Sequence, residues 1–306
     1  MADDEYTPTT AQAKAALESL TIRDEPDAYA IITGCFDYIE KLVNFRASDI
    51  EINSSSRIAK VDKALSPYMV SHHAQRAIMG ATDHLFTIKE VMKGAGTQTT
   101  YGPFTLIRGA LESIAQGLYV LGERNQKTMK TRVLQLEASD DYNARQFAKK
   151  INSENRKQGR TDNIRGATLK AGLRWKDINI NLGYKSVVET AGNSFGMEDN
   201  LVVFWMLTSG IAHNKPWAVI GMTDRVEVEG TRDDVGATYT LTSNTTHIAA
   251  SLRIACIAAD VLINSYYRQA SAQEDRKEFA FARSFQNLNE FIDPYRAKKN
   301  ESTPNP

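Results

Sequence analysis

Hydrophobic residues recur at intervals of three and four along most of the chain, which is the period of an α-helix. One complete stripe spans 104–121, and its members are Phe104, Ile107, Leu111, Ile114, Leu118 and Leu121. A second stripe spans 245–268, and its members are Ile248, Leu252, Cys256, Ala259, Ile263 and Tyr266. We predict that both segments are core helices whose stripes face the interior.

Other segments show the same period less completely. We predict further helices over 11–20, 26–45, 67–93, 126–150, 164–175, 185–195, 200–213 and 270–292. The segment 126–150 is strongly charged, so we expect one wide face in water. The segment 200–213 is apolar all round in its first two turns, which predicts a helix that is buried on most sides. Polar stretches over 48–56 and 152–163 predict loops, and the second is the best candidate for a mobile one.

The pattern changes between 217 and 242. Val226 and Val228 alternate with charged residues, and Tyr239 and Leu241 alternate with threonines, with a turn rich in Gly and Asp between them. Alternation of this kind predicts a β-hairpin. The expected fold is mainly α, an antiparallel helical bundle with one small β-hairpin insertion. We expect an N-terminal segment over 1–24, a bundle domain over 25–270, and a C-terminal helix and disordered tail over 271–306.

Composition restricts the function. Among 306 residues, Lys+Arg and Asp+Glu both number 37, so the net charge is zero and no overall field attracts nucleic acid or an anionic membrane. Cys35 and Cys256 lie inside apolar helical patterns, which is typical of buried thiols in a reducing compartment. His73 and His84 are roughly 16 Å apart along their predicted helix, too far to share a metal. The N-terminus lacks the basic region and apolar core of a signal peptide, so we expect a cytoplasmic protein. The most apolar stretch, 201–207, is too short to span a bilayer, so we expect no membrane. We also expect no metal and no cofactor.

Standard catalytic motifs are absent: the sequence has no P-loop, HExxH or GxSxG, and no GxGxxG after a predicted strand. One pair of charged residues, Arg108 and Glu112, flanks the 104–121 stripe at i,i+4 spacing, so the two side chains can touch. Two interpretations remain open for the pair. Glu112 orients a guanidinium that binds an anionic group, or the two residues form a salt bridge between helices.

Ser209 and His213 also have i,i+4 spacing, at the end of the apolar segment 200–213. A Ser–His nucleophile pair needs an orienting acid and an oxyanion hole, and Glu112 can supply the acid only if the two helices pack together. His213 otherwise lines a polar pocket, or is a core histidine bonded to a backbone carbonyl.

Five more residues are candidates for the lining of a ligand pocket: Asp83, His84, Trp205, Asn214 and Trp217. Histidine can join a polar pocket, and tryptophan can stack on a ring. The competing interpretation places His84 and both tryptophans in ordinary packing. The sequence leaves these alternatives open.

Three segments carry a resemblance to known proteins. They are Thr82-Asp83-His84-Leu85, Thr105-Leu106-Ile107-Arg108-Gly109-Ala110-Leu111-Glu112, and Trp205-Met206-Leu207-Thr208-Ser209-Gly210-Ile211-Ala212-His213. Their order and spacing resemble a set of uncharacterised helical proteins common in actinobacteria. That set is loosely similar to HEPN-like helical proteins and to abortive-infection proteins. The resemblance covers about 66–268, and its specific motifs amount to about a dozen residues.

The resemblance implies an antiparallel helical bundle, often a homodimer, with metal-independent RNA cleavage in active members. Those members carry an arginine within about six residues of the histidine, whereas Arg174 is the nearest arginine upstream of His213 here. We expect a non-catalytic interaction or ligand-binding module. The alternative is a HEPN-like ribonuclease or defence toxin, in which His213 is the acid/base and Arg108 binds the phosphate of RNA.

Overall fold

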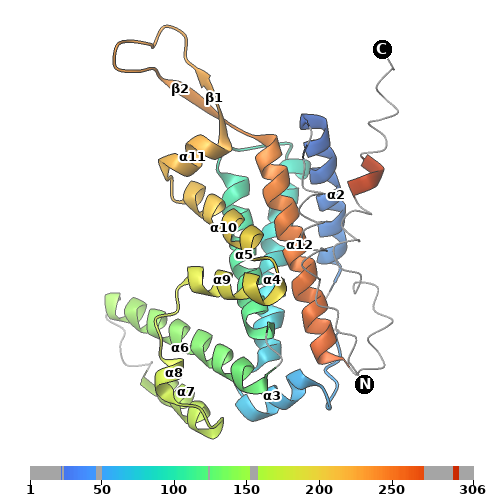
Figure 1. Ribbon diagram of the computed structural model, residues 1–306, viewed down its shortest axis with the longest axis vertical. Coiled ribbons are helices and arrows are strands. Elements are labelled where there is room, and N and C mark those ends of the chain that lie inside the picture. The colour runs from blue at the N-terminus through green and yellow to red at the C-terminus, as the bar shows by residue number, and fades with distance from the viewer. Residues whose placement is uncertain are drawn as a thin grey trace.

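The computed structural model describes Ile22 and the segments 24–45, 50–122, 125–151, 158–271 and 292–295. Within these segments the fold is mainly α with one two-stranded antiparallel sheet, which confirms the predicted class (Figure 1). The predicted helix over 11–20, most of that over 270–292 and the predicted tail lie outside the described residues.

The centre of the bundle is formed by four long helices: α2 (Glu25–Val43), α4 (Val70–Lys89), α5 (Gly102–Leu121) and α12 (Thr245–Ala270) (Figure 1). Every residue of the two predicted stripes is buried, which confirms that α5 and α12 are core helices. Pro103 suits the first turn of α5, and the Asn244 side chain caps α12 by accepting from the backbone N–H of His247. α4 continues into a five-residue π-helix, Glu90–Gly94.

α5 lies in the middle because it packs against α4, α9, α10 and α12. Close contacts fix the directions of its neighbours. Gly109 lies against His84 and Gly117 against Ala77, so α4 and α5 are antiparallel. Gly117 also lies against Leu262, and the Gln269 amide donates to the Leu121 carbonyl, so α12 runs parallel to α5. Both antiparallel and parallel neighbours therefore occur in the bundle.

α12 is the only helix among the described residues that is long and apolar enough to cross a membrane by length and composition. Its most apolar window is 83% buried inside the protein. A core helix passes the same test, so this observation is weak support for a membrane span.

A side group of helices flanks the lower part of the bundle: α3 (Arg57–Leu65), α6 (Gln126–Lys150), α7 (Gln158–Lys170) and α8 (Trp175–Ile178) (Figure 1). α6 has its predicted bounds, but charged side chains of its Glu137 and Asp141 lie at the inner contacts rather than in water. The predicted loop over 152–163 is wrong for 158–163, which form the first turns of α7. The sequence prediction does not include α3, whose Ser56 side chain caps its first turn.

In Figure 1, α9 (Tyr184–Phe195) lies at mid-height above α6, and α10 (Glu198–Ala212) lies above α9. The top is formed by α11 (Pro216–Met222), β1 (Thr223–Glu227) and β2 (Tyr239–Ser243). The predicted hairpin starts too early, because Pro216 opens a helix instead of following one into a strand. The prediction that α10 is buried on most sides holds for most of its described residues, which are buried or half-buried, but one face is open. Val203 and Met206 are 48% and 44% exposed.

Candidate functional site

The predicted charged pair lies where α5 meets α10. Arg108 Nε donates to Glu112 Oε1 at 2.9 Å, and the Trp205 indole Nε1 donates to the same oxygen at 3.1 Å. The side chains of Arg108 and Glu112 are 24% and 16% exposed. One carboxylate oxygen thus accepts two donors, and it ties α10 to α5.

Tyr184 of α9 lies near this pair. Burial raises the pKa of the Tyr184 phenol, and the negative charge of Glu112 raises it further. The neutral phenol is therefore the form present at physiological pH. Glu112 thus joins α5 to α10 through Trp205, and Tyr184 of α9 lies near the same carboxylate.

His213 lies away from the charged pair. It caps the C-terminus of α10, is exposed, and donates its backbone N–H to the Ser209 carbonyl at 3.0 Å. The next residue, Asn214, has a φ of 52° and accepts a hydrogen bond from Tyr101 Oη at 3.3 Å. The pairs Trp205–Glu112 and Asn214–Tyr101 make α10 antiparallel to α5. His213 therefore lies beside the start of α5, about 10 Å along the helix from Arg108.

The remaining predicted residues are spread over two places. The His84 ring lies against Gly109, where an added Cβ would come within 2.6 Å of Nε2. Asp83 is exposed on α4. The Trp217 ring covers Gly210 of α10, yet the residue is 55% exposed. The structure thus brings together Arg108, Glu112 and Trp205, and it does not bring His213 or Asp83 to them.

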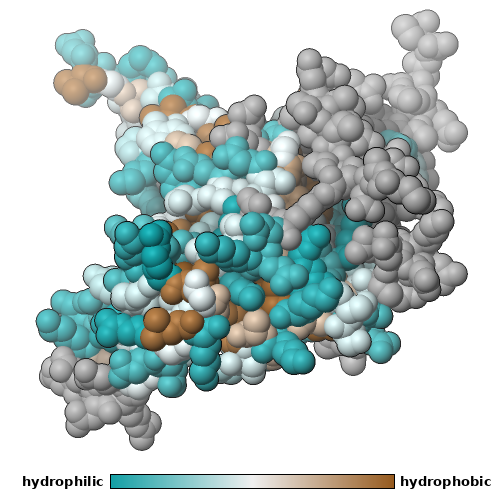
Figure 2. Space-filling view, turned by 60° about the horizontal axis from the view of Figure 1, so that its bottom comes forward, coloured by the Kyte–Doolittle hydropathy of each residue, from teal (hydrophilic) through white to brown (hydrophobic). Residues whose placement is uncertain are grey.

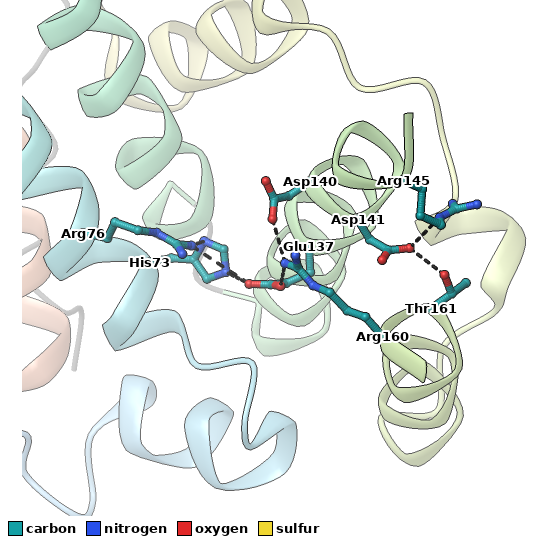
Figure 3. Close-up of polar contacts among 8 residues, drawn as sticks. All are labelled: His73, Arg76, Glu137, Asp140, Asp141, Arg145, Arg160 and Thr161. Atoms are coloured by element: carbon teal, nitrogen blue, oxygen red, sulfur yellow. Dashed lines mark hydrogen bonds and ion pairs between the residues drawn. The ribbon is translucent and has the colours of Figure 1, made fainter. Parts of the chain in front are cut away.

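The sequence prediction missed a larger polar network that joins α4, α6 and α7 (Figure 3). Glu137 is at its centre, with a side chain 11% exposed. One carboxylate oxygen is 2.9 Å from His73 Nε2, and the other accepts from Arg160 Nη2 at 2.9 Å. Burial by itself would raise the pKa of Glu137, but the hydrogen bonds from His73 and Arg160 lower it to about 2. Glu137 is therefore ionised and paired.

Both ring nitrogens of His73 have polar neighbours. Arg76 Nη2 lies 3.1 Å from His73 Nδ1, and a guanidinium can only donate, so Nδ1 accepts. Nε2 lies 2.9 Å from the Glu137 carboxylate, which can only accept, so Nε2 donates to it. Because both ring nitrogens are occupied in this way, His73 acts as a structural clamp and not as a general base.

A second carboxylate extends the network toward the far end of α6. Asp141 Oδ2 accepts from Thr161 Oγ1 at 2.6 Å and from Arg145 Nε at 3.1 Å (Figure 3). Arg160 also reaches Asp140 at 2.7 Å. Positive and negative groups alternate within the network, so it offers no unbalanced field for an ionic ligand.

A third polar group lies between α2 and α12. Burial raises the pKa of Asp260 to about 8, while hydrogen bonds from Tyr38 and Asn264 act in the opposite direction. Asp260 Oδ1 accepts from Tyr38 Oη at 3.5 Å, and Oδ2 accepts from Asn264 Nδ2 at 3.0 Å. Burial likewise raises the pKa of the Cys256 thiol. Thiols in such surroundings are poor nucleophiles.

Comparison of the chain with protein-family models, curated proteins and solved structures finds no match. Among the described residues, no group of three or more His, Cys, Asp and Glu side chains is placed to hold a metal ion. The described residues define a mainly α-helical bundle with an exposed hairpin and internally paired polar groups.

Proposed function

We propose that this protein is a non-catalytic protein-interaction module and that its docking surface lies on α10 and α11. The observation that carries the proposal is a row of half-exposed apolar side chains: Val203, Met206, Trp217 and Ile220 are 48%, 44%, 55% and 50% exposed. We call these four residues the α10–α11 stripe. A cytoplasmic location is part of the proposal, in keeping with the free, buried thiols of Cys35 and Cys256.

The stripe is continuous. Val203, Met206 and Gly210 follow one face of α10 at intervals of three and four residues. The Trp217 ring lies over Gly210, so it extends the stripe from α10 to α11. Ile220 follows Trp217 by three residues, on the same face of α11.

Contact with a partner would remove this apolar surface from water. Full burial of one large apolar side chain contributes about 1.5–3 kcal/mol. Contiguous exposed patches of this kind mark interaction sites, and tryptophan is enriched among the residues that dominate binding. The stripe therefore favours a protein partner over a small polar ligand.

The polar groups of α5 and α10 support a non-catalytic role. The guanidinium of Arg108 and the indole of Trp205 both donate to Glu112. The alternative, a HEPN-like ribonuclease, needs Arg108 and His213 to act on one phosphodiester of RNA. The separation of about 10 Å along α5 argues against that arrangement.

Site-specific photocrosslinking tests the docking surface. A photoreactive amino acid replaces Met206 in the full chain, and the matched control replaces Met79, a 69% exposed methionine of α4. After irradiation in cells, we expect discrete protein adducts from position 206 and none from position 79. Absence of adducts at 206, or equal adducts at both positions, would overturn the proposal.

The ribonuclease alternative has its own test. Purified wild-type chain is incubated with a labelled single-stranded RNA, beside Arg108→Ala and His213→Ala variants whose folding is checked by circular dichroism. We expect all three proteins to leave the RNA intact. Cleavage by wild type that is lost in both folded variants would replace the interaction module with the nuclease.

A further inference from the structure

The hairpin formed by β1 and β2 projects from the body of the molecule at the upper left of Figure 1. After Thr223, which is buried, every residue of β1 is exposed, and β2 has no buried residue. Val226 is 61% exposed, and Val235 near the tip is 96% exposed. Figure 2 shows a hydrophobic patch at that tip. An isolated two-stranded hairpin is only marginally stable in water. We therefore expect another surface to pack against this hairpin.

The two faces of the hairpin differ in charge. The register pairs Arg225 with Leu241 and Glu227 with Tyr239, so these four side chains share one face. On that face Glu227 forms an ion pair with Arg232, and the Arg225 guanidinium lies 6.0 Å from the Tyr239 ring. Arg225, Glu227 and Arg232 thus have partners within the hairpin.

The opposite face carries two valines and three threonines, all of them β-branched. Val226 pairs with Thr240, and the Val228 N–H donates to the Thr238 carbonyl at 2.8 Å. The side chains on this face are Val226, Val228, Thr238, Thr240 and Thr242, with Asp224 at the base. Asp224 accepts from the Asn244 amide at 2.9 Å. We call this surface the valine face. Its valine side chains and threonine methyl groups can pack on the apolar α10–α11 stripe.

We infer that the valine face of one copy covers the α10–α11 stripe of a second copy, in a two-fold dimer that exchanges hairpins. The inference rests on the proposed docking surface and names its partner. A two-fold axis makes such an exchange reciprocal and closed, because each copy both donates a hairpin and receives one.

The geometry of the chain favours a second copy over its own hairpin as the cover. β1 follows α11 directly, and the Thr223 hydroxyl donates to the Val219 carbonyl at 2.6 Å, which holds the junction. From that junction the hairpin leads away from α10 and α11 (Figure 1). The hairpin and the stripe are therefore adjacent in the chain but face different surroundings in one molecule.

Area and charge agree with the exchange. A hairpin face about 20 Å long and 10 Å wide offers roughly 200–300 Å². One such face is too small for a specific interface. The surfaces of two hairpins and two stripes together would bury about 1,000 Å², which is the lower limit for a specific interface. The only charge on the valine face is Asp224 at its base, to which the Asn244 amide donates, and the stripe carries none. The chain has zero net charge, so two copies do not repel.

Sedimentation equilibrium of the full chain tests the inference. We expect wild type to dimerise at micromolar concentration, and Val226→Lys and Met206→Lys each to raise the dimer Kd by at least 100-fold. The matched control is Val43→Lys, which changes a 38% exposed valine on α2 and leaves Kd unchanged. A monomeric wild type, or dimers that tolerate both substitutions, would overturn the inference.

Engineered disulfides identify which surfaces meet. With diamide as oxidant, a chain carrying both Val226→Cys and Met206→Cys is expected to form covalent dimers, and Val226→Cys alone is expected to form none. Efficient crosslinking of the single variant would mean that hairpin packs on hairpin, which contradicts the exchange. The native thiols, Cys35 and Cys256, are buried and are present in every variant, so crosslinking of the wild type gives the background level.

The photocrosslinking experiment separates failure of this inference from failure of the proposed function. Adducts from position 206 with twice the mass of the chain support the exchange. Adducts of another mass, together with a monomeric wild type, refute the second copy and leave the docking surface intact. No adducts at 206 would refute both.

Discussion

Asp260 is a buried carboxyl group whose pKa of about 8 makes the stability of the protein depend on pH. In the unfolded chain its pKa is about 3.9, so between these values the native state binds the extra proton. The protonated, neutral form of Asp260 suits its buried site, so its contribution to stability is complete below about pH 3.9. That contribution is lost as the pH rises to about 8 and the group ionises. The full difference is on the order of 5 kcal/mol. We expect Asp260→Asn, which keeps a neutral side chain, to flatten this dependence in urea unfolding from pH 5 to 9. An unchanged pH slope would show that Asp260 is ionised in the fold.

Glu137 gives a dependence of the opposite sign. Its pKa of about 2 lies below the unfolded value, so its contribution is present above about pH 4.5 and is lost as the pH falls toward 2. After allowance for solvent screening, that contribution is about 2 kcal/mol. Glu137→Gln should lower the free energy of unfolding by this amount at pH 7, with a smaller difference at pH 3. Asp140→Asn, at a 67% exposed side chain, is the control and should change little. Equal losses in the two variants would contradict a central role for Glu137.

Helix packing at the element scale depends on a close contact at Gly117 of α5. A Cβ added there would lie 2.5 Å from Leu262 of α12 and 2.8 Å from Ala77 of α4. Gly117→Ala should therefore cost about 1–3 kcal/mol in chemical denaturation, because two core helices must move apart. Gly166→Ala in α7 meets nothing within 4 Å and should stabilise by about 0.5–1 kcal/mol. If Gly117→Ala stabilises as Gly166→Ala does, the α4–α5–α12 contact is looser than described.

Periodicity predicted α5 and α12 well, because a complete stripe arises only where one helix face is buried along its whole length. It did not predict α3, which is nine residues long, or the true start of the hairpin after α11. It also did not predict the open face of α10, since composition reports how apolar a face is and not what covers it. Exposure of Val203 and Met206 follows from tertiary packing.

In the candidate sites, too, local contacts could be predicted from the sequence and tertiary contacts could not. The Arg108–Glu112 contact follows from i,i+4 spacing, but the Trp205 hydrogen bond needs α10 to pack on α5. The network around Glu137 joins residues 64 and 23 positions away. Contacts between residues so far apart in the sequence cannot be predicted from local spacing. The charged sequence of α6 predicts a solvated face equally well, so the network could be found only in the folded chain.

At the scale of the whole molecule, the hairpin should be separable from the bundle. Thr223 and Ser243 are paired across the strands, so a two-residue Asn-Gly turn can replace 224–242. We expect the shortened chain to fold with the same helical circular dichroism, because the removed residues contribute no side chain to the core. A large fall in Tm at every protein concentration would mean that the hairpin supports the bundle.

The dependence of Tm on concentration then connects the hairpin to assembly. Dimerisation stabilises only the folded state, so the Tm of an exchanging dimer rises as the protein is concentrated. Wild type should show this rise between about 1 and 100 μM, and the shortened chain should not. The contrast relies on one structural fact, that the hairpin is ordered beside α11 while its valine face has no cover within the described part of its own chain. A rise of equal size in both proteins would place the dimer contact elsewhere.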